Sequence, residues 1–166
     1  MSVKIREAEP RDAGPIAEIY NYYILNSVIT FEEIALGVDD MAARVNEIQC
    51  ANLPWLVAED HTGVVGYAYA SKWRARAAYR HTLESTVYLD PNFAAKGIGS
   101  ALYDALFASL SERSIHVVIG VIALPNEASI RLHEKFGMQK AAHLSEVGFK
   151  FNRWVDVGYW QVILPA

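Results

Sequence analysis

The sequence has 166 residues, of which 52% are hydrophobic and 20% are charged, which is enough to bury the core of a single domain spanning residues 1–166. Its 15 Lys and Arg residues against 19 Asp and Glu residues give a net charge of -4 at pH 7, without any basic run or stripe. This balance argues against nucleic acid and anionic membranes as partners, and it favours a small molecule.

The first residues lead directly into an alternating pattern without a hydrophobic signal region, and no apolar run approaches the length of a membrane-spanning helix. We therefore expect a cytoplasmic protein without a membrane partner. Cys50 is the only cysteine, so no internal disulfide can form, and its place in a helical pattern predicts a buried, small hydrophobic residue. No group of His, Asp and Glu residues has metal-ligand spacing, and we expect no metal.

The first third of the chain is predicted to alternate strand and helix. Period-two alternation over residues 3–8 predicts a strand, and Asp12 is expected to cap a helix with one apolar face, formed by Ile16, Ile19, Tyr20, Tyr23 and Ile24. Residues 30–32 form a short extended piece. Asp39 and Asp40 then begin a second helix that carries three residues toward the core, Met41, Val45 and Ile48. We expect the loops between these helices to overhang the functional site.

Strand patterns dominate the middle of the sequence. Residues 55–59 and 64–71, separated by a short turn-rich link, predict an antiparallel hairpin. Residues 72–81 interrupt the alternation with five cations or potential cations, so this segment is expected to be a functional loop. Period two resumes over residues 82–89 and stops at Pro91, which cannot donate to a sheet.

The next elements predict a parallel pair of strands. Apolar spacing predicts a helix over residues 99–113, and the continuous apolar run at 116–122 predicts a buried strand. With the strand at 82–89 they form a right-handed βαβ unit. We expect its two strands to run parallel and then splay apart.

The C-terminal part predicts one more helix and two strands. Pro125 and Asn126 begin the helix, and Gly137 ends it. A strand begins with residues 138–143, and a final strand of alternating aromatic and aliphatic residues spans 154–164. The fold class is therefore a mixed α/β domain.

The helix at residues 99–113 opens with two glycines and a cation, in the run Lys96-Gly97-Ile98-Gly99-Ser100. The first backbone N–H groups of a helix point outward and bind anions, so a diphosphate is the expected ligand. The sequence G-x-x-x-x-G-K-[ST] of a Walker loop is absent, and a dinucleotide fingerprint would need a small residue at Leu102. A turn whose glycines serve only its geometry is the alternative.

This region, VYLDPNFAAKGIGSAL, resembles the acyl-CoA motif of the GCN5-related N-acetyltransferases (GNAT), whose core is [QR]-x-x-G-x-[GA]. Gly97 and Gly99 match, whereas Ala94 stands where the family usually has Gln or Arg. The resemblance implies a mostly antiparallel central sheet with two splayed parallel strands, flanked by helices. It also implies acetyl-CoA as co-substrate, held by Val87, Tyr88, Leu89, Ala94, Ala95, Lys96, Gly97, Ile98, Gly99 and Ser100.

A second segment, PNEASIRLHEKFGM, resembles the GNAT motif N-x-x-[SA]-x-x-[LF]-[YH]-x-x-x-G-[FM], which flanks the pantetheine arm. Asn126 and Ser129 are the polar contacts that this resemblance implies. Without it, Asn126 would be interpreted as a helix N-cap and Ser129 as a first-turn residue.

The match narrows to one branch, because VIALPNEASIRLHEKFGM, ESTVYLDP and GFKFNRWVDVGYWQ resemble the phosphinothricin and methionine sulfoximine N-acetyltransferases. This resemblance covers residues 3–164 and implies a small amino-acid amine as acceptor. It implies Glu84 as general base, Tyr103 and His133 as further catalytic-site residues, and a substrate-binding set of Phe31, Arg74, Arg76, Tyr79 and Arg80. It also implies a homodimer, consistent with the aromatic-rich segment FNRWVDVGYW.

Guanidinium groups suit the α-carboxylate of an amino acid, which supports an arginine-rich substrate loop with Arg76 as the first choice. A solvated charged turn is the alternative for this loop, and a hydrogen-bonded core histidine is the alternative for His133. Two other functions stay open: acetylation of another amine, such as a protein N-terminus or a polyamine, and a non-catalytic acyl-CoA sensor. The arginines argue against a cationic acceptor, and Glu84 argues against a silent sensor.

Overall fold

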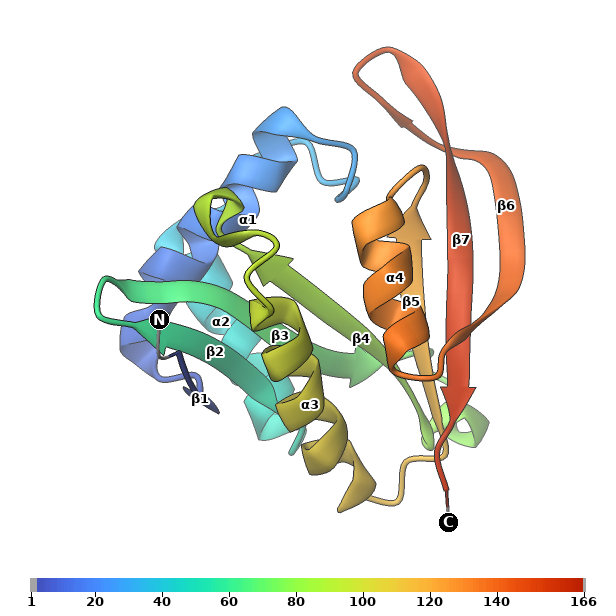
Figure 1. Ribbon diagram of the computed structural model, residues 1–166, viewed down its shortest axis with the longest axis horizontal. Helices are drawn as coiled ribbons and strands as arrows, with labels where there is room; N and C mark the ends of the chain where they lie inside the picture. The colour runs from blue at the N-terminus through green and yellow to red at the C-terminus, as the bar shows by residue number, and fades with distance from the viewer. Residues whose placement is uncertain (1–2, 166) are drawn as a thin grey trace.

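A mixed sheet with the strand order β1-β2-β3-β4-β5-β7-β6 forms the centre of the computed structural model, which describes residues 3–165 (Figure 1). The strands are β1 (Lys4–Glu7), β2 (Trp55–Asp60), β3 (Gly63–Lys72), β4 (Thr82–Leu89), β5 (Val117–Ala123), β6 (Gln139–Lys150) and β7 (Arg153–Ile163). The helices are α1 (Ala13–Asn26), α2 (Val38–Cys50), α3 (Ile98–Ser111) and α4 (Glu127–Lys135). Three short 3₁₀ turns lie at Pro10–Asp12, Ala77–Tyr79 and Pro91–Phe93.

The splay between β4 and β5 is the feature of the sheet that positions the site. These strands pair in parallel only from Thr82 to Ser85 on β4 and from Val117 to Gly120 on β5. Beyond these residues they diverge, with α3 lying over β3 and β4 on one side of the gap and α4 beside β5 on the other (Figure 1). The other strand pairs of the described residues are antiparallel. The expected parallel pair and its splay are confirmed.

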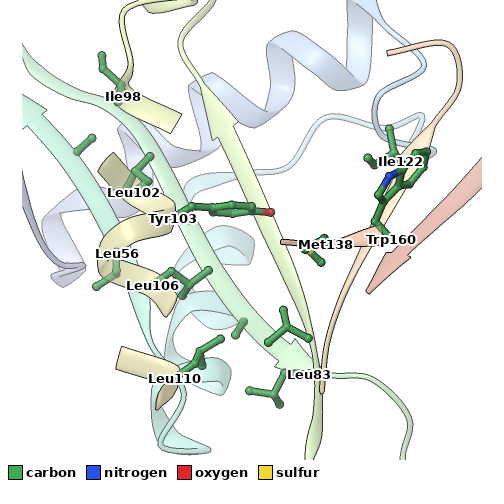
Figure 2. Packing of buried hydrophobic residues seen from close by; sticks show 14 of the residues in the cluster. Leu56, Leu83, Ile98, Leu102, Tyr103, Leu106, Leu110, Ile122, Met138 and Trp160 are labelled. Carbon is green, nitrogen blue, oxygen red and sulfur yellow. The ribbon is translucent and has the colours of Figure 1, made fainter. Parts of the chain in front are cut away.

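Two apolar clusters hold the helices on opposite faces of the sheet. Leu102, Leu106 and Leu110 recur at helical spacing on α3 and are fully buried against the sheet (Figure 2). On the other face, α1 and α2 bury a second cluster that includes Ile16 and Met41. Since both faces are covered, the open end of the splay is the place where a ligand can enter between strands.

Most predicted elements agree with the structure within a few residues, and two expectations are wrong: the burial of Cys50 and the side-chain cap of Asp12 on α1. Residues 30–32 belong to no strand of the described chain. Cys50 is exposed, not buried, because it lies five residues after Val45 and therefore roughly 140° around α2 from that buried position. No helix within residues 3–165 has the length and apolar character needed to cross a membrane.

Asp12 does not cap α1 with its side chain, contrary to the expectation. Its carboxylate lies 2.7 Å from the guanidinium of Arg6 and accepts a 2.7 Å hydrogen bond from the Glu9 N–H. Arg6 also pairs with Glu59 at 2.9 Å. A partly buried guanidinium binds a carboxylate more strongly than a helix N–H does, so Asp12 joins this ion-pair network.

Candidate active site

Two adjoining cavities open at the splay. The inner pocket, of about 280 Å³, lies over β4 and is lined by Glu84, Thr86, Tyr69, Tyr103 and His133, among others. The outer cleft, of about 510 Å³, lies between the end of β4, the start of α3 and one side of α4. Five residues line both cavities, namely Ile29, Val87, Tyr88, Asn126 and Ser129. A ligand in the cleft can therefore reach the pocket.

The turn before α3 forms one end of the outer cleft. Gly97 is the N-cap residue and has a φ of 79°, a left-handed conformation that favours glycine. Gly97, Gly99 and Ser100 line the cleft, so the first N–H groups of α3, which have no intrahelical acceptor, lie at its edge. A Cβ at Gly99 would lie 3.3 Å from Leu132 Cδ2, so this glycine lets α3 and α4 approach closely. The turn therefore has the geometry that an anion site at a helix N-terminus requires.

Most of the residues that the first motif assigned to the cofactor line the cleft, as the expectation requires: Val87, Tyr88, Leu89, Ala94, Ala95, Gly97, Gly99 and Ser100. Two side chains do not. Lys96 donates from Nζ to the Asn92 carbonyl at 3.1 Å and lies over the Phe93 ring. The side chain of Ile98 is buried in the core beside α3, so only its backbone can serve the cleft.

Asn126 and Ser129, from the second motif, lie where the cleft meets the pocket. The Asn126 side-chain oxygen accepts the Ser129 N–H at 3.1 Å and caps α4. The N-cap interpretation of Asn126 is confirmed. It is compatible with a contact to the co-substrate, because capping uses the side-chain oxygen and leaves the amide nitrogen as a donor.

Glu84 lines the inner pocket. It lies in the middle of β4, where it pairs with Ile119 on β5. It is half-buried, and burial raises the pKa of its carboxyl above the ordinary value, while the positive charge of Arg74 acts in the opposite direction. A carboxylate with a raised pKa and access to a pocket is suited to accept a proton near neutral pH.

A chain of hydrogen bonds between uncharged side chains forms one wall of the inner pocket, beside Glu84. The Ser129 carbonyl can only accept, so His133 Nδ1 carries the proton and donates to it at 2.7 Å. His133 Nε2 is then the acceptor for the Tyr103 hydroxyl at 3.1 Å, and the Tyr103 oxygen accepts from the Ser85 hydroxyl at 3.2 Å. Figure 2 shows the Tyr103 ring extending from α3 with its oxygen pointing away from the helix.

Burial keeps this wall uncharged. It lowers the pKa of His133, against the opposing effect of the Ser129 carbonyl, and it raises the pKa of Tyr103. Gly120 makes the arrangement possible, because a Cβ there would overlap the His133 ring. His133 is thus both a hydrogen-bonded buried histidine and a residue that lines the pocket.

The remaining walls come from residues that sequence reasoning did not select. Tyr20, Thr30 and Tyr69 line the inner pocket beside Phe31, which was selected. Tyr20 and Tyr69 fall at apolar positions of a helix and a strand, so their pattern is typical of core residues. Thr86 offered the one available signal, since it shares a face of β4 with Glu84.

The structure does not bring the predicted arginine loop into the pocket of its own chain. Arg76, Tyr79 and Arg80 are exposed, and Arg80 donates to the Ala77 carbonyl at 3.2 Å. Arg74 stacks over the Trp73 ring at 4.7 Å and acts on Glu84 only through its charge. Within residues 3–165, no three or more His, Cys, Asp or Glu side chains are grouped so as to hold a metal ion.

A cleft between splayed parallel strands, with helix N–H groups at one end and a half-buried carboxylate at the other, is the arrangement of an acyl-CoA-dependent transferase. The GNAT acetyltransferase domain matches residues 5–158. The chain belongs to the GNAT family of acetyltransferases and is an acetyl-CoA-dependent N-acetyltransferase. The resemblance seen in the sequence and the expected fold are both confirmed.

Two curated relatives are similar over nearly the whole chain. A phosphinothricin N-acetyltransferase of Streptomyces viridochromogenes is 39% identical over 159 residues, which are 96% of this chain and 86% of that protein. An L-methionine sulfoximine/L-methionine sulfone acetyltransferase of Salmonella typhimurium is 34% identical over 96% of this chain and 94% of its own length. The crystal structure of a phosphinothricin acetyltransferase from Sinorhizobium meliloti in complex with acetyl-CoA is 38% identical and has a TM-score of 0.95, covering 99% of this chain and 89% of that one.

Proposed function

We propose that this protein transfers the acetyl group of acetyl-CoA to the α-amine of a small amino acid or analogue of the phosphinothricin, methionine sulfoximine or methionine sulfone type. The observation that carries the proposal is the position of Glu84, whose carboxyl has a raised pKa in a pocket that joins the acyl-CoA cleft. The names of the two curated relatives support this acceptor class.

In this proposal the cleft binds acetyl-CoA mainly through backbone groups. The N–H groups at Gly97 and Gly99 face the diphosphate, while Val87, Asn126 and Ser129 border the arm that leads to the pocket. Acetyl-CoA supplies an activated thioester, so the chain needs no nucleophile of its own. Its role is to hold donor and acceptor in contact and to remove one proton from the acceptor's amine.

In this proposal Glu84 accepts that proton. The α-amine of an amino acid is mostly ammonium at neutral pH and cannot attack a thioester in that form, so a base must remove a proton directly or through one water. Tyr103 and His133 complete the catalytic set as a neutral wall: the Tyr103 hydroxyl donates to Nε2 of His133, and its oxygen lone pairs orient groups in the pocket. Because this wall carries no charge, it neither attracts nor repels the charge of Glu84.

The acceptor's carboxylate is assigned to the arginine loop, with Arg76 as first choice and with Arg74, Tyr79 and Arg80 beside it, while Phe31 borders the acceptor's side chain. Because the loop is exposed in a single chain, we propose that the protein acts as a homodimer in which the second subunit borders the acceptor pocket. The β6–β7 hairpin offers a surface for this contact, with exposed Leu144, Val147, Phe149, Phe151 and Trp154. Light scattering at micromolar concentration tests the dimer, and a monomeric mass contradicts it.

We further propose a single catalytic domain that works in the cytoplasm on a small molecule, without a nucleic-acid or membrane partner. The experiment that tests the function is a thiol-release assay with acetyl-CoA against amino acids, their sulfones and sulfoximines, phosphinothricin, polyamines and peptides. Turnover of the amino-acid group supports the proposal. Preference for polyamines or peptides moves the enzyme to another acceptor class, and no turnover at all leaves only acyl-CoA binding.

A further inference from the structure

The segment that follows α1 crosses from one half of the splayed sheet to the other. Residues 30–32, the bridging segment, extend from α1 toward the β6–β7 hairpin (Figure 1). Thr30 and Phe31 line the inner pocket. Since β4 and β5 stop pairing at Ser85 and Gly120, the two halves of the sheet share no ladder at this end.

The bridging segment is fixed first to the helices of the N-terminal half. The Thr30 hydroxyl lies 2.8 Å from the Tyr20 hydroxyl, and Tyr20 also donates to Glu32. Arg44 of α2 holds the Glu32 carboxylate with two hydrogen bonds, of 2.6 and 2.8 Å. A bidentate guanidinium–carboxylate pair fixes both position and orientation.

Its second attachment is to β6, in the C-terminal half. Lys150 is 2% exposed, and its ammonium donates to the Thr30 carbonyl at 2.8 Å. Lys150 forms no ion pair among the residues that the structure describes. Burying an ammonium is costly, and the charges of Glu32 and Glu33 on the neighbouring segment offset part of that cost, so the bond to Thr30 is a specific feature of the site.

Gly148 makes the third attachment possible. It lies two residues before Lys150, so both face the same side of β6, and both are buried while Phe149 between them is exposed. A Cβ at Gly148 would overlap the Cζ and Cε2 atoms of Phe31. Only glycine therefore lets the Phe31 ring rest on the β6 backbone.

We propose that Gly148 and Lys150 are positioning residues that hold the bridging segment across the splay, and that Gly148 sets the size of acceptor side chain that the inner pocket admits. With a larger residue at 148, the Phe31 ring has to leave β6, and one of its neighbouring spaces is the pocket that it lines. The pocket then becomes smaller without any change in the acyl-CoA cleft, which neither residue lines. This inference rests on the proposed function, because it assigns the inner pocket to the acceptor.

The first test is Gly148→Ala, assayed with acceptors of graded size: 2-aminobutyrate, norvaline and methionine sulfone. We expect the KM of methionine sulfone to rise about tenfold, the order of effect of one methylene in a fitted pocket, and that of 2-aminobutyrate to change much less. The Kd of acetyl-CoA should stay the same. Gly14→Ala in α1 is the matched control, because nothing lies within 4 Å of a Cβ added there.

A second change separates a size effect from general damage. Phe31→Leu in the Gly148→Ala background removes the ring that the new methyl group displaces, so it should restore the KM of methionine sulfone. A uniform rise of KM for all three acceptors, an unchanged acceptor profile, or failure of Phe31→Leu to restore it would overturn the role of Gly148.

Lys150→Met tests the attachment of the bridging segment to β6, and the experiment needs no acetyl acceptor. Methionine keeps the packing but cannot donate to the Thr30 carbonyl, so amide hydrogen exchange over residues 27–36 should accelerate while that of α3 does not. Lys4→Met, at an exposed lysine that begins β1, is the control. Unchanged exchange in that segment overturns the bridge. If the wild type acetylates none of the amino acids, the proposed function fails, whereas the exchange experiment still decides the bridge.

Discussion

Nε2 of His133 lies 3.1 Å from the hydroxyl oxygen of Tyr103, and the direction of this hydrogen bond is fixed by the carbonyl that His133 binds at its other nitrogen. Tyr103 must donate, so its oxygen presents only lone pairs to Ser85 and to the inner pocket. The Tyr103 hydroxyl thus joins α3 to α4 and to β4 through two buried hydrogen bonds.

Tyr103→Phe removes the central member of this chain. It leaves Ser85 and His133 without their buried partner, which costs about 1–3 kcal/mol for unsatisfied polar groups. We expect the free energy of unfolding, measured in urea, to fall by that order. Ser85→Ala in the same background should recover part of the loss, because it removes one of the groups left unpaired. An unchanged unfolding midpoint for Tyr103→Phe would show that the chain does not stabilise the fold.

Glu84→Gln keeps the shape of the proposed general base but removes its charge. We expect kcat to fall by roughly 10²–10⁴-fold, the usual span for general base catalysis, with acetyl-CoA affinity unchanged. Raising the pH should partly rescue the variant, since more of the amine is then already deprotonated. Steady-state kinetics from pH 6 to pH 9 measure both effects; if kcat near neutral pH stays within about threefold of the wild type, the proton must leave by another route.

The same carboxyl should reduce stability, because its folded-state pKa is raised above the ordinary value of 4.5. A raised pKa means that ionisation favours the unfolded chain, so the folded protein loses stability as pH rises from 4.5 through the folded-state pKa. Glu84→Gln should therefore raise Tm at pH 8 and have less effect at pH 4. A fall in Tm at pH 8 would contradict desolvation as the dominant influence on Glu84.

Gly99→Val tests the diphosphate turn. The added side chain meets Leu132, whose Cδ2 is 3.3 Å from the Cβ position, and should push α3 away from α4 or block the N–H groups at the cleft. We expect a weaker Kd for acetyl-CoA by calorimetric titration. Gly14→Val supplies the control for a helical glycine with open space around it. Equal Kd values for wild type and Gly99→Val would mean that this glycine only shapes the turn.

Arg76→Ala tests the carboxylate clamp. A charged hydrogen bond contributes roughly 1.5–3 kcal/mol, so the KM of the amino-acid acceptor should rise by about tenfold or more while acetyl-CoA binding stays constant. Arg11→Ala, at an exposed arginine that pairs with exposed Glu9 at 2.7 Å, serves as the control for loss of an arginine. Comparison of an amino acid with its methyl ester gives a second readout, and equal wild-type activity on both would exclude any clamp.

The elements nearest the cofactor cleft were predictable because their signals are local. Period two over β4, the turn glycines and the 3.6-residue spacing of α3 each determine their structure within a short window. The inner pocket was harder to predict, because Tyr20 and Tyr69 have the pattern of core residues until the fold places a cavity beside them. Lys150 is the extreme example: a lysine in a strand that is exposed over residues 139–147 is expected at the surface, and its burial follows from its contact with the distant residue Thr30.

The short pairing between β4 and β5 has a thermodynamic consequence for the unliganded enzyme. From Thr86 to Tyr88, β4 is paired with β3 alone, so its polar backbone groups on the other side lack a strand within the described chain. Exposed strand edges of this kind accept extended ligands that have amide groups of their own, as the pantetheine arm of coenzyme A does. The co-substrate would then serve as a temporary strand of the sheet, and cellular acetyl-CoA at about 100 times its Kd would add roughly 2.7 kcal/mol to the stability of the folded enzyme.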